Sequence, residues 1–225
     1  MNSFDTWESY SYPETFDPDT GEATLRNLYQ ERDAQVLKAR EYTQVAMRSA
    51  EISSGLAQIP QSFDAAHLKA IHQYLFQDLY EWAGEYRTVD ITKGMTTFAS
   101  ANDGSIDRRL SNVQGLVASV SWSELERTAF VENASAVFAE LNQAHPFREG
   151  NGRSAKVFME LLAETTPFEL NWHAVPAPVW NQASEFSGPD LGAWKTHPEE
   201  LHEVFGHIVV MRQEIPVESS TPPQD

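Results

Sequence analysis

Residues 145–153 read His-Pro-Phe-Arg-Glu-Gly-Asn-Gly-Arg, and this stretch decides how the rest of the chain is interpreted. Gly150 and Gly152 predict a turn whose backbone can approach a ligand without an intervening Cβ. The residues that follow, 154–164, carry apolar side chains at helical spacing, so the turn opens a helix. The N–H groups and the dipole at a helix N-terminus bind anions, which makes a polyphosphate the expected ligand.

The side chains of this stretch supply chemistry that suits a bound polyphosphate. His145 can accept a proton from a group that attacks the phosphate, although a lone histidine is more often structural. Glu149 could be a solvated acid, but beside a phosphate-binding turn it fits a Mg²⁺ ligand, because Mg²⁺ combines one carboxylate with phosphate oxygens and waters. Asn151 offers amide donors where charge develops in the transition state, and Arg153 can hold a phosphate bidentately. Phe147 is expected to anchor the turn in the core.

The stretch matches, at every fixed position, the signature His-x-Phe-x-(Asp/Glu)-Gly-Asn-Gly-Arg, and the chain therefore resembles the Fic family. Residues 63–72 and 75–85 resemble the upstream helix of that family and the glycine that leads to its flap. Residues 190–209 fall where the family has its closing helix, so the resemblance covers about residues 10–210. It implies an all-α fold, a Fic-type helical domain with one β-hairpin flap.

The resemblance also implies an activity, that of a protein adenylyltransferase that transfers AMP from ATP to a Tyr, Thr or Ser hydroxyl of a target protein. His145 would be the general base, Glu149 would hold Mg²⁺ between the α- and β-phosphates, and Arg153 would bind the β-phosphate. Lys156 stands where most relatives carry a second arginine for the γ-phosphate, so the charge is kept but the planar fork is lost. The implied nucleotide-binding residues are Arg148, Gly150, Asn151, Gly152, Arg153 and Lys156.

Two alternatives to this activity are a Doc-type kinase and a binding module. A Doc-type kinase binds ATP reversed, but that branch has lysine at the second glycine, and Gly152 disfavours it. A degenerate Fic fold acting as a binding module would be expected to lose His145, Glu149 or Asn151. All three are present, which disfavours it. At 25–27 the chain resembles the toxin class that is regulated by a separate small antitoxin, whose relatives act on DNA gyrase and topoisomerase IV. Residues 128–133 fit the family's inhibitory pattern, but we interpret this match as a coincidence within a core helix.

Residues 87–98 change from helical spacing to alternation, which predicts a short β-hairpin. In Fic enzymes the matching element is a flap that pairs with the target by strand addition. The residues expected to form its tip and clamp are Lys93, Gly94, Thr96, Thr97 and Phe98.

Composition restricts the remaining choices. The chain has 225 residues and a net charge of −17, which disfavours nucleic-acid binding, although Arg148, Arg153 and Lys156 would make a nucleotide site locally basic. It has no cysteine, so thiol catalysis and disulfides are excluded. Neither a secretory signal nor a membrane-spanning run is visible, which predicts a cytoplasmic protein; export as an effector by a specialised machine would leave no readable trace.

The predicted organisation is an extended N-terminal arm at 1–22, the Fic domain at 23–213 and a disordered tail at 214–225. The arm is expected to dock through Tyr10, Tyr12 and Phe16. Histidines such as His67 and His72 are five residues apart, which does not favour a shared metal site. Trp172, Trp180 and Trp194 could be core residues or walls of an adenine pocket. Helices are expected at 23–54, 64–81, 104–119, 123–143, 152–164, 178–186 and 189–213.

Overall fold

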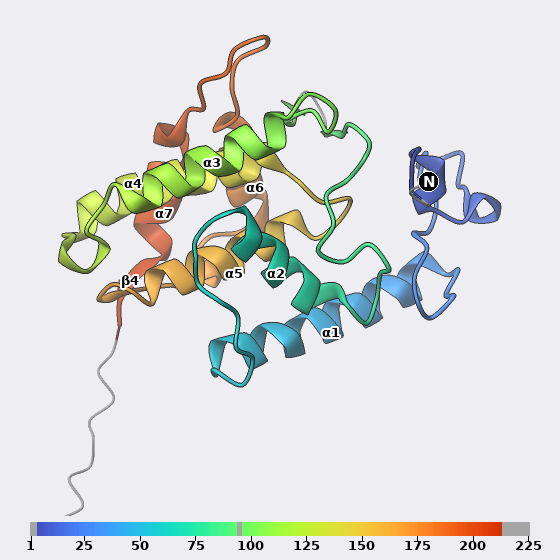
Figure 1. Ribbon diagram of the computed structural model, residues 1–225, viewed down its shortest axis with the longest axis horizontal. Coiled ribbons are helices and arrows are strands. Elements are labelled where there is room, and N and C mark those ends of the chain that lie inside the picture. The colour runs from blue at the N-terminus through green and yellow to red at the C-terminus, as the bar shows by residue number, and fades with distance from the viewer. Residues whose placement is uncertain (1–3, 94–95, 213–225) are drawn as a thin grey trace, which may run out of the picture.

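The computed structural model describes residues 4–93 and 96–212 of the chain, and most of its regular structure is helical. In Figure 1, α2 and α5 lie between α1 on one side and α3 with α4 on the other. The mostly helical fold expected from the sequence is confirmed. The helices are α1 (Ala34–Ser53), α2 (Ala65–Phe76), α3 (Ser105–Ala118), α4 (Arg127–Ala144), α5 (Asn151–Ala163), α6 (Ala177–Phe186) and α7 (His202–Ile208).

Helix α4 forms the centre of the core, and it packs against α3, α5 and α7. Its apolar residues are buried around most of the helix, which is the pattern of a helix enclosed by others rather than one lying at the surface. Phe130 and Val137 of α4 and Phe158 of α5 have no measurable exposure. The 145–153 stretch comprises the connection between α4 and α5 and the first three residues of α5. None of the helices in the described ranges is long and apolar enough to cross a membrane.

The expected helix at 23–54 is wrong at its beginning, because α1 begins only at Ala34. Asp33 caps it by accepting hydrogen bonds from the N–H groups of Gln35 at 2.8 Å and Val36 at 3.1 Å. Upstream, Gln30 has φ of 56°, a left-handed conformation that an α-helix cannot contain. The Asn27 amide closes that turn by accepting from the Glu31 N–H at 3.0 Å.

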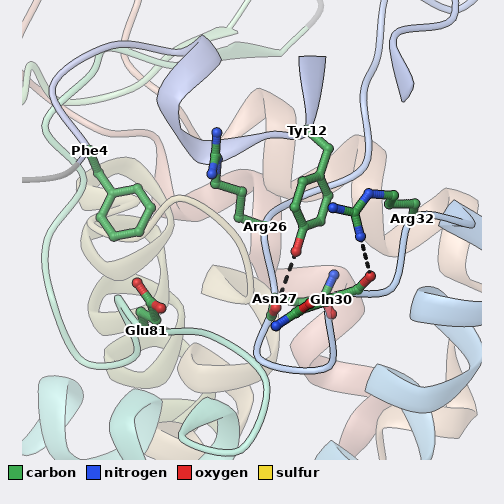
Figure 2. Close-up of a pocket in the computed structure, with 7 residues that line it drawn as sticks. All are labelled: Phe4, Tyr12, Arg26, Asn27, Gln30, Arg32 and Glu81. Carbon is green, nitrogen blue, oxygen red and sulfur yellow. Dashed lines mark hydrogen bonds between the residues drawn. The ribbon is translucent and has the colours of Figure 1, made fainter. Parts of the chain in front are cut away.

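The N-terminal arm docks on the domain through aromatic side chains, as expected for Tyr10 and Tyr12, which are both buried. Phe16 does not take part, since 58% of it is exposed. A pocket of about 260 Å³ lies between the arm, the 26–32 turn and Glu81, and Figure 2 shows Tyr12 donating to the Asn27 carbonyl beside Arg32. The guanidinium of Arg32 donates to the Gln30 carbonyl and pairs with Glu14, so it stabilises the arm itself.

Two small antiparallel sheets complete the fold. The predicted hairpin is present as β1 (Thr92–Lys93) and β2 (Thr96–Thr97), with Thr92 opposite Thr97. The second sheet, β3 (Phe168–Leu170) with β4 (Val209–Met211), was not predicted. The expected helix at 189–213 is accordingly wrong at both ends. A 3-10 turn starts only at Pro198 and leads into α7, and after Ile208 the β-branched Val209 and Val210 pair with β3.

Candidate active site

His145 lies at the point where α4 ends, directly beside the flap. Its backbone is left-handed, with φ of 40° and ψ of 55°, a conformation in which α-helices commonly end. The His145 ring stacks on the Phe98 ring, with the centroids 3.8 Å apart and the planes 16° from parallel. Phe98 follows β2 immediately. The histidine expected to accept the proton therefore contacts the end of the hairpin expected to act as the flap.

Arg87 holds this junction together, and the sequence did not single it out. Only 2% of Arg87 is exposed, and its Nε donates to the His145 carbonyl at 2.8 Å. Its two terminal nitrogens donate to the carbonyls of Val89 and Ala99, one on each side of the hairpin. Burial lowers the pKa of the guanidinium. All three of these hydrogen bonds are to backbone carbonyls. Asp90, three residues on, lies 3.7 Å from Nη1 of Arg87, which indicates a local ion pair and not the contact with the His145 carbonyl.

The Asn151 side chain closes the loop on itself. Its Oδ1 accepts from the Phe147 N–H at 2.8 Å, and its Nδ2 donates to the Phe147 carbonyl at 2.7 Å. Phe147 is fully buried, which agrees with its expected role as an anchor. The Asn151 amide therefore braces the loop here, and the contact with an α-phosphate stays a prediction that would use its second N–H.

The two glycines of the loop are required for different reasons. Gly150 has φ of +83°, and a Cβ there would lie 2.3 Å from the Phe76 ring, so the fold itself demands glycine. A Cβ on Gly152 would meet nothing within 4 Å. The protein does not need glycine at 152, which leaves room for a ligand at the first turn of α5, where backbone N–H groups lack helical partners.

Arg153 lies between two carboxylates, of which only one was expected. Its Nη2 is 3.0 Å from Oε1 of Glu149, and its Nη1 is 2.5 Å from Oε1 of Glu41 in α1. The second oxygen of Glu41 accepts a hydrogen bond from the buried Tyr80 hydroxyl. Glu41, Glu149 and Arg153 line a groove of about 410 Å³ beside α1. Glu41 lies over 100 residues from the motif, so no local pattern could have indicated it.

His72 supports the loop from below and is a second residue whose role was missed. It is fully buried, its Nδ1 accepts from the Gly84 N–H at 2.8 Å, and its Nε2 lies 3.0 Å from the Glu149 carbonyl. The Gly84 N–H can only donate, so the ring proton is placed on Nε2. Burial lowers the pKa of His72 to about 3, so the ring is neutral. His72 thus joins α2 to Gly84 and to the 145–153 loop.

Lys156 and two tryptophans form a cluster on the neighbouring face of α5. The Lys156 Nζ lies 5.0 Å from the Trp172 ring centre and 5.5 Å from that of Trp180. Burial lowers the pKa of Lys156 and raises that of Glu160, to which Trp172 donates a hydrogen bond of 2.7 Å. Trp180 is buried against Phe138 and Phe205, whereas Trp194 is 44% exposed.

Arg148 is covered by the N-terminal arm. Its guanidinium carbon lies 3.7 Å from the Trp7 ring centre, and burial lowers its pKa. For Arg148 to contact the nucleotide as expected, Trp7 would have to move away from the guanidinium. Otherwise the nucleotide would have to approach an edge of the guanidinium that Trp7 does not cover.

The flap residues are placed unevenly. Lys93 and Thr96 face each other in the backbone register, and Thr97 is exposed while its carbonyl accepts from the Gln143 amide at 2.9 Å. Gly94 lies outside the described residues. Phe98 is 8% exposed beneath His145, so its surroundings are those of the active site rather than of a hairpin tip.

Known proteins resemble this chain in sequence and in fold. Residues 62–163 match the model of the Fic/DOC family. The chain is 32% identical over 182 residues to "Probable protein adenylyltransferase Fic" of Escherichia coli K12, covering 79% of this chain and 83% of that protein. It is 35% identical to "Protein adenylyltransferase VbhT" of Bartonella schoenbuchensis, covering 75% of this chain and 34% of that protein. The BepC effector protein of Bartonella tribocorum, solved with bound AMPPNP, has a TM-score of 0.78 at 25% identity, covering 92% of this chain and 98% of that one. Because its sequence matches the family model and these relatives, the chain belongs to the Fic/DOC family.

Proposed function

We propose that this chain is a protein adenylyltransferase that transfers AMP from ATP to a side-chain hydroxyl of a target protein. One observation carries the proposal: the His145 ring stacks on Phe98 at the end of the hairpin, and His145 stands six residues before the first residue of α5. A base, an anion site and a docking strand are the three parts that such a transfer needs. Relatives named as protein adenylyltransferases, and the nucleotide bound to the BepC protein, support the same conclusion.

In the proposed reaction the target hydroxyl oxygen bonds to the α-phosphorus of ATP. The hydroxyl proton passes to the His145 imidazole, the bond from the α-phosphorus to the bridging oxygen of the β-phosphate breaks, and pyrophosphate leaves. Arg153 and the first-turn amides of α5 hold the phosphates, while Gly152 leaves space for their approach. Most of the rate would come from positioning and from neutralising charge.

Glu149 is the residue that fits Mg²⁺. Its side chain is 45% exposed at the mouth of the loop, where a carboxylate and the phosphate oxygens could share the ion. Bound there, Mg²⁺ would neutralise charge on the triphosphate. Glu149 would have to exchange its contact with Arg153 for that role, and its exposure makes the movement possible.

The partners remain proposals that rest on the family resemblance. The target would present a Tyr, Thr or Ser hydroxyl, and DNA gyrase and topoisomerase IV are the first substrates to test. A separate small antitoxin would inhibit the enzyme, as in the toxin class. The proposed location is the cytoplasm. Export as an effector is the alternative, and the translocated BepC protein favours it.

Mass spectrometry of a target after incubation with ATP tests the proposal. Added AMP supports an adenylyltransferase, added phosphate a Doc-type kinase, and an unchanged target a binding module. In parallel, the His145→Ala variant should lose about 10²- to 10⁴-fold in transfer rate, the contribution of a general base, while it still binds ATP. Transfer at the wild-type rate by this variant would exclude His145 as the base.

A further inference from the structure

We propose that Glu41 of α1 is a positioning residue, which holds Arg153 in place for the phosphates of ATP. The inference rests on the proposed function, since it concerns the same nucleotide site, and it adds a residue from a helix outside the motif. The observation behind it is the ion pair between Arg153 Nη1 and Glu41 Oε1 at 2.5 Å.

Glu41 is fixed more firmly than an ordinary surface carboxylate. It lies within a helix of 20 residues, and its side chain is only 12% exposed. One of its oxygens contacts Arg153, and the other accepts a hydrogen bond from Tyr80, which is itself buried. A carboxylate held on both sides by fixed donors has little freedom, so it determines where the guanidinium lies.

The two carboxylates around Arg153 differ in mobility. The Glu149 side chain is 45% exposed and belongs to the loop, whereas Glu41 belongs to a helix and is buried. When Glu149 turns toward a metal-bound triphosphate, Nη2 of Arg153 becomes available to a phosphate oxygen. Nη1 stays on Glu41, so the guanidinium keeps its place and offers its remaining N–H groups to the phosphate.

The test must distinguish two opposite effects of Glu41 on ATP binding, support and weakening. A carboxylate beside a phosphate-binding arginine also partly cancels its charge, so Glu41 could weaken ATP binding instead of supporting it. The buried position favours support, because an arginine that loses a buried partner is left without a fixed orientation. The Glu41→Gln variant keeps the shape and removes the charge, so it decides between the two.

The same helix offers a matched control. Glu51 of α1 also accepts from a tyrosine, Tyr74, at 2.6 Å, and it pairs with an arginine, Arg48, at 3.1 Å. It lies ten positions further along, about 15 Å at the rise of an α-helix, and Arg48 is not part of the loop. Glu51→Gln therefore breaks an equivalent tyrosine–glutamate–arginine cluster without touching the nucleotide site.

The experiment compares full-length wild type, Glu41→Gln and Glu51→Gln. It measures the dissociation constant of ATP in the presence of Mg²⁺, and the KM for ATP and the kcat of target modification. We expect Glu41→Gln to bind ATP about 10-fold more weakly, the usual cost of losing an orienting partner, with KM raised more than kcat is lowered. Glu51→Gln should match wild type. In the Arg153→Ala background, Glu41→Gln should have no further effect on binding, since it acts through that arginine.

Unchanged or tighter ATP binding by Glu41→Gln would overturn the inference, and so would an effect that persists in the Arg153→Ala background. If Glu41→Gln does not fold, Tyr80→Phe takes its place, since it releases one side of the carboxylate and should weaken ATP binding in the same direction. Wild-type enzyme that adds no AMP to any target would instead refute the proposed function, so the two failures are distinguishable.

Discussion

Replacing Gly150 with alanine should destabilise the fold, while the same change at Gly152 should not. At Gly150 the new side chain must adopt φ of +83°, and its Cβ would lie 2.3 Å from Cζ of Phe76. Phe76 is fully buried, so its ring cannot move without disturbing the core. Gly152 has φ in the ordinary range and open space around the position of a Cβ.

The magnitudes follow from these two environments. A left-handed backbone costs an alanine roughly 1–2 kcal/mol. Displacing a well-packed ring adds roughly 1–3 kcal/mol, so Gly150→Ala should lower the free energy of unfolding by about 2–5 kcal/mol. For a domain of this size that corresponds to a fall in melting temperature of about 4–20 °C. Gly152→Ala should instead raise stability by up to about 1 kcal/mol, because alanine favours the helix.

The assay is urea unfolding followed by circular dichroism, with AMP transfer measured on the same preparations. Gly152→Ala is expected to be stable but poorly active, because its methyl group enters the space kept for the phosphates. Gly150→Ala with the unfolding free energy of wild type would refute the steric argument. Full activity of Gly152→Ala would show that the phosphates do not approach that position.

Three further predictions concern His72, the hairpin and Lys156. Because the pKa of His72 is lowered to about 3, its contribution to stability is present above pH 6.5 and is lost as the pH falls toward 3. Between pH 6.5 and pH 5 this should amount to roughly 2 kcal/mol, and His72→Gln should show a shallower pH dependence of the unfolding free energy; equal slopes would contradict the neutral, buried ring. Thr97→Pro should reduce target modification, since proline cannot donate to a paired strand, while ATP binding survives; equal loss of ATP binding would assign the hairpin to the nucleotide pocket. Lys156→Arg should bind an antitoxin-type inhibitor more tightly and turn over faster through its planar fork, as dissociation constants and kcat would report; unchanged inhibition would remove Lys156 from the γ-phosphate role.

Much of the site could be predicted because its parts are close together in the chain. His145, Glu149, Gly150 and Arg153 fall within nine residues, and the helix that follows them was predicted to within one residue at each end. Short-range geometry is a property of the local sequence, since glycine tolerates positive φ and a helix N-terminus exposes its amides wherever it occurs. The positions of α3, α4 and α6 followed from their apolar spacing in the same way.

Only the tertiary structure decided which distant residues support the loop. Residues 23–33 have helical apolar spacing, yet they are irregular with a turn at 28–29. The Leu28 N–H bonds to the Leu79 carbonyl there, and Asn27 accepts a hydrogen bond from the Glu31 N–H. Likewise Val209 to Met211 became a strand because β3 lies beside them.

The supporting residues Arg87, His72 and Glu41 were invisible to pattern analysis for the same reason. Arg87 contacts the His145 carbonyl, and His72 contacts the Glu149 carbonyl. Glu41 pairs with Arg153, which lies 112 positions further along the chain. The local pattern therefore determined the fold family, and it predicted His145 as the base and the 145–153 stretch as an anion-binding loop. The arrangement that holds Arg153 and His145 in place came only from packing, because partners that are remote in sequence meet only once the core has formed.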